Sequence, residues 1–320
     1  MTQISVGPDA RPAGESKWAD LADGPVHYVD HGGPDGAPLA VLVHGLGGSH
    51  ANWAALAPLL TADLRVVAVD LAGFGLTPAG PRPSSVSGNA DLLYRFVTAL
   101  SPEPVVLVGN SMGGMIGALL TNAHPEAVRG LALLDPVLPL TAALPDRLVT
   151  ANVLQAALPL RARMALADRR GMIPRERAAM QLVTLCCDDP DRVTEDVIDV
   201  HLALAERRGF VEETARDFAL AGRSMVFTFA RRRTYAKLLR SIEKPVLLIH
   251  GTRDRLVPFR VARVAAAANP HWSFFPATNI GHVPMLEAPS WTSARILEWL
   301  SMDVACPPPP RGRARWGTSR

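Results

Sequence analysis

The sequence predicts an α/β fold, in which a doubly wound and mostly parallel sheet carries a helical insertion near its middle. Short runs that are apolar throughout are typical of parallel strands covered by helices on both faces. Helical stretches alternate with the first four runs, as a doubly wound sheet requires. Two further strand-like runs follow only after a long interval. The six predicted strands are Ala40–Val43, Val66–Val69, Val105–Val108, Leu131–Leu134, Pro245–Ile249 and Trp272–Phe275.

The interval between the fourth and fifth strands differs in character from the rest. Residues 136–236 show helical periodicity, mix Arg with acidic residues and contain few strand-like runs, which predicts a helical cap. Earlier helices are expected at Trp53–Leu60, Ala90–Ala99 and Met112–Ala123. The predicted parts are a flexible N-terminus (1–16), an α/β core (17–135 and 237–303), the cap (136–236) and a disordered Pro/Arg-rich tail (304–320).

The composition and the distribution of charge limit the kinds of partner that we expect for this chain. The chain of 320 residues is 48% hydrophobic, enough for one large domain with an insertion. Its net charge of +3 comes from four arginines after Asp303, because the remainder holds 29 basic and 30 acidic residues. We therefore expect a small-molecule substrate rather than a nucleic acid, and the composition leaves homo-oligomer formation open.

Targeting and cofactor signals are weak. No apolar stretch approaches the roughly 20 residues of a membrane helix, so no stable membrane insertion is expected. The N-terminus lacks the apolar centre of a signal peptide, which favours a cytoplasmic location. The three cysteines, Cys186, Cys187 and Cys306, form no zinc-like spacing with His, and we expect no metal and no cofactor.

The segment after the third strand carries the strongest chemical signal. Gly109-Asn110-Ser111-Met112-Gly113 joins a buried strand to an apolar helix, and it has the spacing of a nucleophile elbow. The two glycines remove Cβ atoms that would collide around a sharply turned serine. The turn also places Ser111 at a helix N-terminus, where negative charge is favoured.

From about Pro25 to Leu300, the chain resembles the serine-nucleophile branch of the α/β-hydrolase superfamily. The Gly-Asn-Ser-Met-Gly-Gly form is similar to bacterial esterases and carbon–carbon bond hydrolases of that superfamily. The resemblance implies a mostly parallel sheet of eight strands and an oxyanion hole. The glycine-rich loop His44–Gly48 follows the first predicted strand, and by resemblance the oxyanion donors are the backbone N–H groups of Leu46 and Met112.

A serine nucleophile needs a base, and the base needs an orienting acid. In this fold the chain order is Ser, acid, His. His282 lies in a Gly-His segment beyond the last strand, and Asp254 lies in His250-Gly-Thr-Arg-Asp254 after the fifth; both segments resemble those of the family. Asp135 is an alternative acid, since some members place it one strand earlier. His44 and the segment Asp70–Thr77 are interpreted as structural, although Phe74 and Leu76 could line the entrance.

These residues predict hydrolysis through an acyl-enzyme. The cap should cover the carboxyl ends of the strands and shape an apolar pocket for a small or medium ester-like substrate. The predicted pocket residues are Met115, Leu138, Leu140, Val283 and Met285.

Other activities on the same scaffold remain open. A serine at the elbow disfavours the epoxide hydrolases and haloalkane dehalogenases, which use aspartate there. Carbon–carbon hydrolases of ring-cleavage products share the Asn110–Met112 context, but they usually carry Trp where this chain has Val283. A cofactor-free perhydrolase would use the same triad. A non-catalytic ligand receptor can also retain it.

Overall fold

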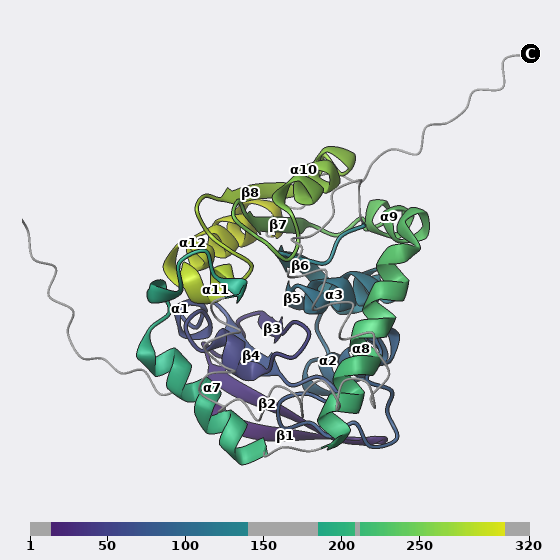
Figure 1. The fold of residues 1–320 in the computed structure, drawn as a ribbon, viewed down its shortest axis with the longest axis vertical. Helices are drawn as coiled ribbons and strands as arrows, with labels where there is room; N and C mark the ends of the chain where they lie inside the picture. Colours follow the sequence, from purple (N-terminus) through teal and green to yellow (C-terminus); the bar gives the residue numbers. More distant parts are fainter. Residues whose placement is uncertain (1–13, 140–184, 209–211, 305–320) are drawn as a thin grey trace, which may run out of the picture.

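The computed structural model describes residues 14–139, 185–208 and 212–304. Eight strands of this part form one sheet in the order β1-β2-β4-β3-β5-β6-β7-β8 (Figure 1). β2 pairs antiparallel with β1 and β4, and the pairs from β4 through β8 are parallel. The strands are β1 (Glu15–Leu21), β2 (Gly24–Gly32), β3 (Leu39–Val43), β4 (Arg65–Val69), β5 (Val105–Asn110), β6 (Val128–Leu134), β7 (Val246–Gly251) and β8 (Ser273–Ala277).

All six predicted strands are confirmed, as β3 to β8. The mostly parallel sheet of eight strands that the resemblance implies is also confirmed, but the positions of its first two strands were not predicted. β1 is the edge of the sheet and is half exposed along its length, so it lacks the apolar run of a buried strand. β1 begins at Glu15, and its first two residues therefore lie in a strand rather than in the flexible N-terminus expected for 1–16.

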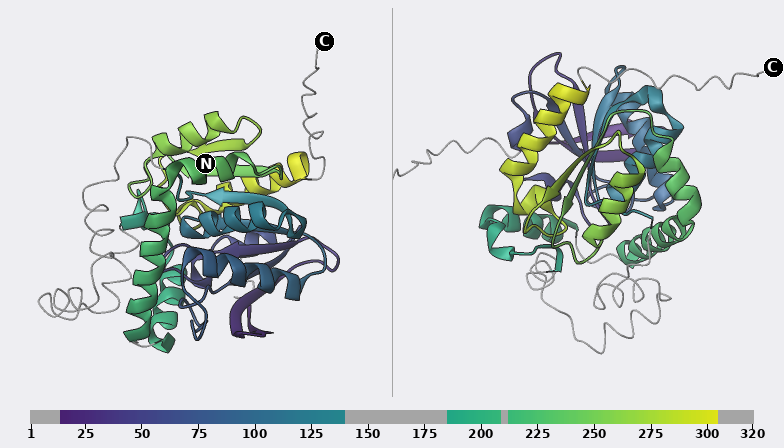
Figure 2. Two further views of the ribbon diagram at one scale, coloured as in Figure 1. Left: turned by 90° about the vertical axis from the view of Figure 1, so that its right-hand side faces the viewer. Right: turned by 90° about the horizontal axis from the view of Figure 1, so that it is seen from above.

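Helices pack on both faces of the sheet, as the doubly wound prediction requires. Seen from above, yellow α12 lies on one face and blue α2 and α3 on the other (Figure 2). Each face has its own apolar cluster of side chains, one with α2, α3, α8 and α10 and the other with α1 and α12. The helices are α1 (Ala57–Leu60), α2 (Val86–Leu100), α3 (Met112–Ala123), α7 (Glu195–Arg208), α8 (Glu212–Ala230), α9 (Arg232–Arg240), α10 (Phe259–Ala268), α11 (Pro284–Glu287) and α12 (Pro289–Trp299), with short turns η1 (His50–Trp53), η2 (Pro125–Ala127), η3 (Pro190–Arg192) and η4 (Leu300–Val304).

One predicted helix is divided. Trp53–Leu60 was expected to be continuous, but η1 ends at Trp53 and α1 begins at Ala57. Ser49 caps η1 by accepting the Ala51 N–H, and a proline sits in the first turn of α1, which fits a fresh helix start.

The described part of residues 136–236 is largely helical. α8 lies against the loops that follow β3 and β4: a Cβ atom on Gly47 would come within 2.9 Å of Phe218, and one on Gly73 within 2.6 Å of Asp217. This position is at the carboxyl ends of the parallel strands. The cap boundaries at 136 and 236 stay a prediction, and α9 runs four residues past the second of them. Among the described helices, none combines the length and apolar character of a membrane span.

Candidate active site

Strand register brings the candidate residues to one edge of the sheet. Val43 of β3 pairs with Gly109 of β5, and Asn110 of β5 pairs with Leu134 of β6. The chain leaves these three strands at His44, Ser111 and Asp135. Because the strands are parallel, their carboxyl ends meet, and residues distant in sequence become neighbours.

Ser111 has the backbone of a nucleophile elbow. Its φ of 53° and ψ of −116° are rare for a residue with a side chain. Its N–H donates to Leu134 O at 3.1 Å, and its carbonyl accepts the Val137 N–H at 3.1 Å. These two hydrogen bonds fix the turn against the end of β6. Its side chain makes no capping hydrogen bond to α3. The serine is therefore held in a strained turn with its hydroxyl uncommitted to the helix.

The predicted steric reason for the two glycines is confirmed. A Cβ atom on Gly109 would lie 2.6 Å from the backbone of Gly113. One on Gly113 would lie 2.5 Å from His44 O and closer still to Val43 O. These are backbone atoms of packed elements, so they cannot move aside as a flexible side chain could. Only glycine lets α3 approach β3 and β5 this closely.

We predict that Gly113→Ala will destabilise the protein and disable the elbow. The new methyl group must push α3 away from β3, so the free energy of unfolding should fall by about 3 kcal/mol. Gly117→Ala in the same helix is the matched control, because its Cβ would meet only the ends of the Leu131 and Leu107 side chains, at 3.0 and 4.0 Å. That variant should be neutral or gain up to ~1 kcal/mol from better helix propensity. Denaturant unfolding measures both, and equal stabilities for the two variants would contradict this explanation.

His282 and Asp254 are placed together. His282 Nδ1 lies 2.8 Å from Asp254 Oδ2, and both side chains are almost completely buried. Asp254 Oδ1 accepts the N–H groups of Leu256 and Val257 at 2.7 and 3.0 Å. Burial alone would raise the pKa of Asp254, but His282 and His250 outweigh it and hold that pKa well below its usual value. Asp254 is therefore ionised, and His282 donates its Nδ1–H to it.

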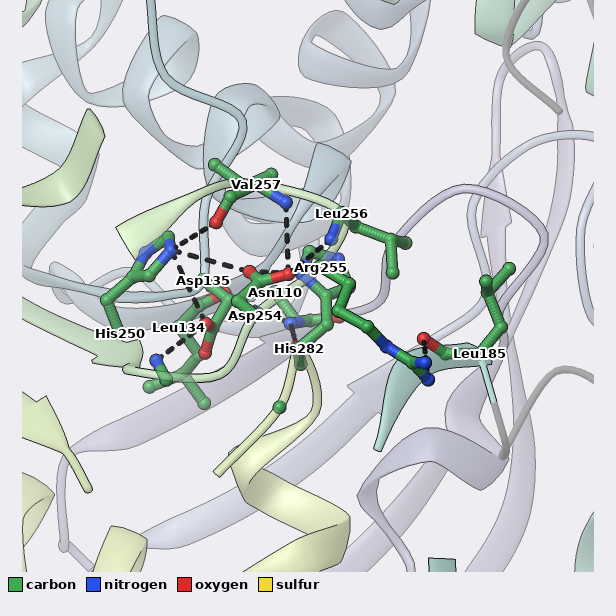
Figure 3. A network of polar contacts seen from close by, with 12 residues as sticks. Asn110, Leu134, Asp135, Leu185, His250, Asp254, Arg255, Leu256, Val257 and His282 are labelled. Atoms are coloured by element: carbon green, nitrogen blue, oxygen red, sulfur yellow. Dashed lines mark hydrogen bonds and ion pairs between the residues drawn. The ribbon is translucent and has the colours of Figure 1, made fainter. Parts of the chain in front are cut away.

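Asp135, the alternative acid, lies beside this pair. Donor atoms of Asp135, Asp254 and His282 all lie within 4.8 Å of one another. Figure 3 shows His250 beside both carboxylates: its Nε2 is 3.4 Å from Asp254 Oδ2, 3.7 Å from Asp135 Oδ1 and 2.8 Å from Val257 O. Burial raises the pKa of Asp135 well above its usual value, His250 opposes this, and the charge of Asp254 adds to it. Of these two neighbouring carboxyl groups, Asp135 therefore favours its protonated form and Asp254 its ionised form.

The backbone of His282 is held at both ends. Its N–H donates to Cys186 O at 2.6 Å, and its carbonyl accepts from Asn110 Nδ2 at 3.0 Å. The same amide group donates to Leu134 O at 3.0 Å. The residue before the serine and a residue of the predicted cap therefore clamp the histidine. Sequence reasoning missed both roles, and the place of Asn110 inside the elbow was the available signal for the first.

Glu287 is a second residue that sequence reasoning left without a role. Its carboxylate is fully buried and accepts the N–H groups of Gly281 at 2.8 Å, Asp188 at 3.2 Å and Asp189 at 3.0 Å. Arg192 Nη1 reaches it at 3.3 Å. The carboxylate therefore ties the segment 188–192 of the predicted cap to the residue that precedes His282. A charged residue within the otherwise apolar Val283–Glu287 was the signal in the sequence.

We predict that Glu287→Gln will lower kcat by about 10²-fold, because a small displacement of a reacting group can cost that much. In the variant, the amide nitrogen of the glutamine, which is a donor, replaces a carboxylate oxygen that accepted backbone N–H groups. Donor then faces donor, and the segment shifts. KM should change little, since the carboxylate lies behind the histidine. Glu126→Gln, at an exposed glutamate, is the control and should behave like the wild type. A loss of stability without a selective loss of kcat would contradict a positioning role.

The glycine-rich loop after β3 lies against the serine. A Cβ atom on Gly45 would be 3.1 Å from the Ser111 Cβ. Met112 is the first residue of α3, where N–H groups have no partner within the helix. This arrangement suits the two expected donors, Leu46 and Met112, whose role stays a prediction. His44 fits its structural interpretation: Nδ1 lies 2.7 Å from Gly45 O, and Nε2 accepts the Leu71 N–H at 3.1 Å.

The predicted pocket residues divide between two clusters. Met115 and Leu138 pack in the cluster that contains α3 and α8, and Val283 and Met285 pack in the one on the other face. All four are buried, and Leu140 lies outside the described residues. The first cluster also contains Ala221 and Met225 of α8 and Tyr235 of α9, which sequence reasoning did not select.

Two groups of described residues have the donor types of a metal site, namely His27, His50 and Asp70, and Asp135, Asp254 and His282. In each group a carboxylate oxygen already accepts hydrogen bonds from imidazole nitrogens at 2.8 Å. Asp70 and Asp254 also accept backbone N–H groups. Both groups therefore work as hydrogen-bonded networks in which the carboxylate fixes the imidazole proton.

Comparisons with known proteins agree with this geometry. The family model described as alpha/beta hydrolase fold matches residues 38–289. A 2-hydroxymuconate semialdehyde hydrolase of a Pseudomonas strain is 27% identical, over 74% of this chain and 77% of the relative. A pimeloyl-[acyl-carrier protein] methyl ester esterase of Neisseria meningitidis is 29% identical, over 71% and 80%. The solved structure of a 2-hydroxy-6-oxo-6-phenylhexa-2,4-dienoate hydrolase from a Rhodococcus strain has a TM-score of 0.71 and 24% identity, and covers 90% of this chain and 99% of that one.

Proposed function

The chain belongs to the alpha/beta hydrolase fold family, and on that premise we propose that it is a serine hydrolase that cleaves ester-like substrates through an acyl-enzyme on Ser111. The observation that carries the proposal is the 2.8 Å contact between His282 Nδ1 and the ionised Asp254, at the sheet edge where the elbow presents Ser111. A buried imidazole oriented by a carboxylate is the base that a serine nucleophile needs.

The first half-reaction follows from these groups. Because the Nδ1–H of His282 is committed to Asp254, the lone pair of His282 lies on Nε2 and can take the Ser111 proton. The serine oxygen then attacks the substrate carbonyl carbon. Negative charge on the former carbonyl oxygen is stabilised by the N–H groups of Leu46 and Met112, each worth about 3 kcal/mol. When the intermediate collapses, the bond from the acyl carbon to the leaving oxygen breaks, and the protonated His282 gives its proton to that oxygen, which departs as an alcohol.

The second half-reaction repeats the sequence with water. His282 takes a proton from a water molecule, whose oxygen attacks the acyl carbon. The tetrahedral intermediate collapses, the Ser111 oxygen leaves, and His282 returns the proton to it. The products are a carboxylic acid and the free enzyme. Every proton transfer uses groups of this chain, and the reaction needs no cofactor.

The apolar residues next to the elbow support an apolar acyl group. Met112, Met115 and Leu138 share a cluster with Ala221 and Met225 of α8. An acyl chain that reaches the elbow from the side of α8 would pack against these side chains. We propose a small or medium acyl group, because all five side chains are already buried.

Carbon–carbon bond hydrolysis of ring-cleavage products is the second candidate. Relatives at 26–28% identity carry such names, including 2-hydroxy-6-oxo-2,4-heptadienoate hydrolase of Pseudomonas putida. Both reactions start from the same triad, and they differ in whether oxygen or carbon leaves the acyl carbon. The Val283 side chain next to the base, in place of the Trp usual in that group, favours the ester reaction.

A paired substrate screen tests the proposal. Purified protein is assayed with p-nitrophenyl esters of graded chain length and, at equal concentration, with a dienone ring-cleavage product. We expect the higher kcat/KM with a short or medium ester. A higher kcat/KM for the dienone would show that the enzyme is a carbon–carbon bond hydrolase rather than an esterase. No turnover of either class, with no labelling of Ser111 by a fluorophosphonate, would favour a ligand receptor and overturn the proposal.

A further inference from the structure

A second chain of Ser, His and Asp side chains lies outside the elbow, toward the antiparallel edge of the sheet. Ser16 of β1 places its Oγ 2.7 Å from His27 Nε2 of β2. His27 Nδ1 lies 2.8 Å from Asp70 Oδ2, just after β4. β1, β2 and β4 are adjacent at the antiparallel edge of the sheet. The order of contacts, hydroxyl to Nε2 and Nδ1 to carboxylate, is the one that activates a serine.

The buried carboxylate fixes the proton of His27. Asp70 is fully buried and accepts the N–H groups of His50 at 2.7 Å and Leu76 at 2.9 Å, besides the Nδ1–H groups of His27 and His50 at 2.8 Å each. Burial alone would raise the pKa of Asp70, but the two histidines outweigh it and hold that pKa well below its usual value. An ionised Asp70 keeps a proton on His27 Nδ1, so the Nε2 lone pair faces the Ser16 hydroxyl.

The serine is accessible, unlike its two partners. Ser16 is exposed on the edge strand, whereas His27 and Asp70 are fully buried. Trp18 lies two residues along the strand and therefore on the same face. Its side chain is 49% exposed, and its ring packs edge-on against that of His27, 5.0 Å between centroids. An aromatic ring bound on Trp18 would lie next to the Ser16 hydroxyl.

We propose that Ser16 is a second acyl-accepting site, activated by His27 and Asp70 and specific for activated aryl esters. The Ser16 oxygen bonds to the acyl carbon while its proton passes to His27 Nε2. The bond from the acyl carbon to the aryloxide breaks, and the aryloxide leaves with that proton. The product is an O-acyl Ser16 and a phenol, with no other reactant.

The two serines should differ strongly in rate. Ser16 sits in an extended strand, whereas Ser111 sits at a helix N-terminus beside a glycine-rich loop. Since one oxyanion donor is worth about 10²–10³-fold in rate, Ser16 should acylate at least that much more slowly than Ser111. Ser16 thus acts as a slow acceptor whose reaction is seen when Ser111 is absent.

The test uses the Ser111→Ala variant of the full chain, incubated with p-nitrophenyl acetate and analysed by peptide mass spectrometry. Fragment ions and release by neutral hydroxylamine distinguish an ester on Ser16 from an amide on the adjacent Lys17. Ser301, an exposed serine whose hydroxyl donates to Glu298 O at 2.7 Å, is the internal control. We expect Ser16 to be acetylated at least tenfold faster than Ser301. Equal rates at the two serines would overturn the proposal.

A variant of His27 tests whether this residue activates Ser16. His27→Asn keeps an N–H donor near Asp70 and removes Nε2, so acetylation of Ser16 should fall at least tenfold. Fluorophosphonate labelling of Ser111 in an otherwise wild-type His27→Asn protein checks that the fold survives. Undiminished Ser16 acetylation in that variant would contradict activation by His27. The comparison of Ser16 with Ser301 decides the proposal even if His27→Asn does not fold, and labelling of Ser111 reports separately on the main site.

Discussion

Ser111→Ala should lower kcat toward the most active ester by about 10⁴-fold or more, because the members of a catalytic triad act as a unit and the remaining residues cannot replace the nucleophile. The strained backbone at Ser111 is set by the packing of β5, β6 and α3, and its side chain makes no capping bond. Alanine should therefore keep the fold, with a change in unfolding free energy within about 0.5 kcal/mol.

Steady-state kinetics and a thermal melt on the same preparation check both parts of this expectation. A second serine outside the site, Ser87, provides the matched control, since it is exposed at the start of α2. Ser87→Ala should match the wild type in kcat. A Ser111→Ala protein with kcat within tenfold of the wild type would remove the elbow serine from the mechanism.

Asp254→Asn should lower kcat by about 10⁴-fold, because an asparagine amide group favours the wrong tautomer of the base. The adjacent carboxyl gives the matched comparison. Asp135→Asn keeps an oxygen that can accept the Gly251 N–H, which Asp135 Oδ1 accepts at 2.8 Å, and it replaces a group that already favours its neutral form. Its kcat should fall by less than about tenfold.

The same ester assay ranks the two variants. The reverse order, with Asp135→Asn the more damaged, would assign the acid to Asp135 and leave Asp254 a structural role. Circular dichroism of both proteins controls for folding, because each substitution lies in a fully buried cluster.

The buried strands could be predicted from sequence because each is an uninterrupted apolar run. The positions of β1 and β2 could not, because β1 is half exposed along its length and β2 buries polar residues such as His27 and Asp30. The burial of His27 depends on Asp70, which lies 43 residues away, and nothing local marks that contact.

The candidate catalytic residues were accessible to sequence reasoning because their motifs are short and local. Their supports are not local. Cys186 and Glu287 act on the histidine loop through contacts between segments almost a hundred residues apart, as the Asp188–Glu287 bond illustrates. The predicted pocket residues stay a prediction; Met115 of α3 packs on one face of the sheet and Met285 of α11 on the other, and the sequence does not say toward which face each of them points.

Covalent labelling of the wild-type protein by a fluorophosphonate, with the adduct mapped by peptide mass spectrometry, tests whether Ser111 is the nucleophile and His282 its base. We predict a stoichiometric adduct on the Ser111 oxygen, formed at least 10²-fold more slowly in His282→Ala, because the base that activates the serine is gone. A folded wild-type protein that forms no adduct at Ser111, or one that labels equally fast without His282, would contradict it.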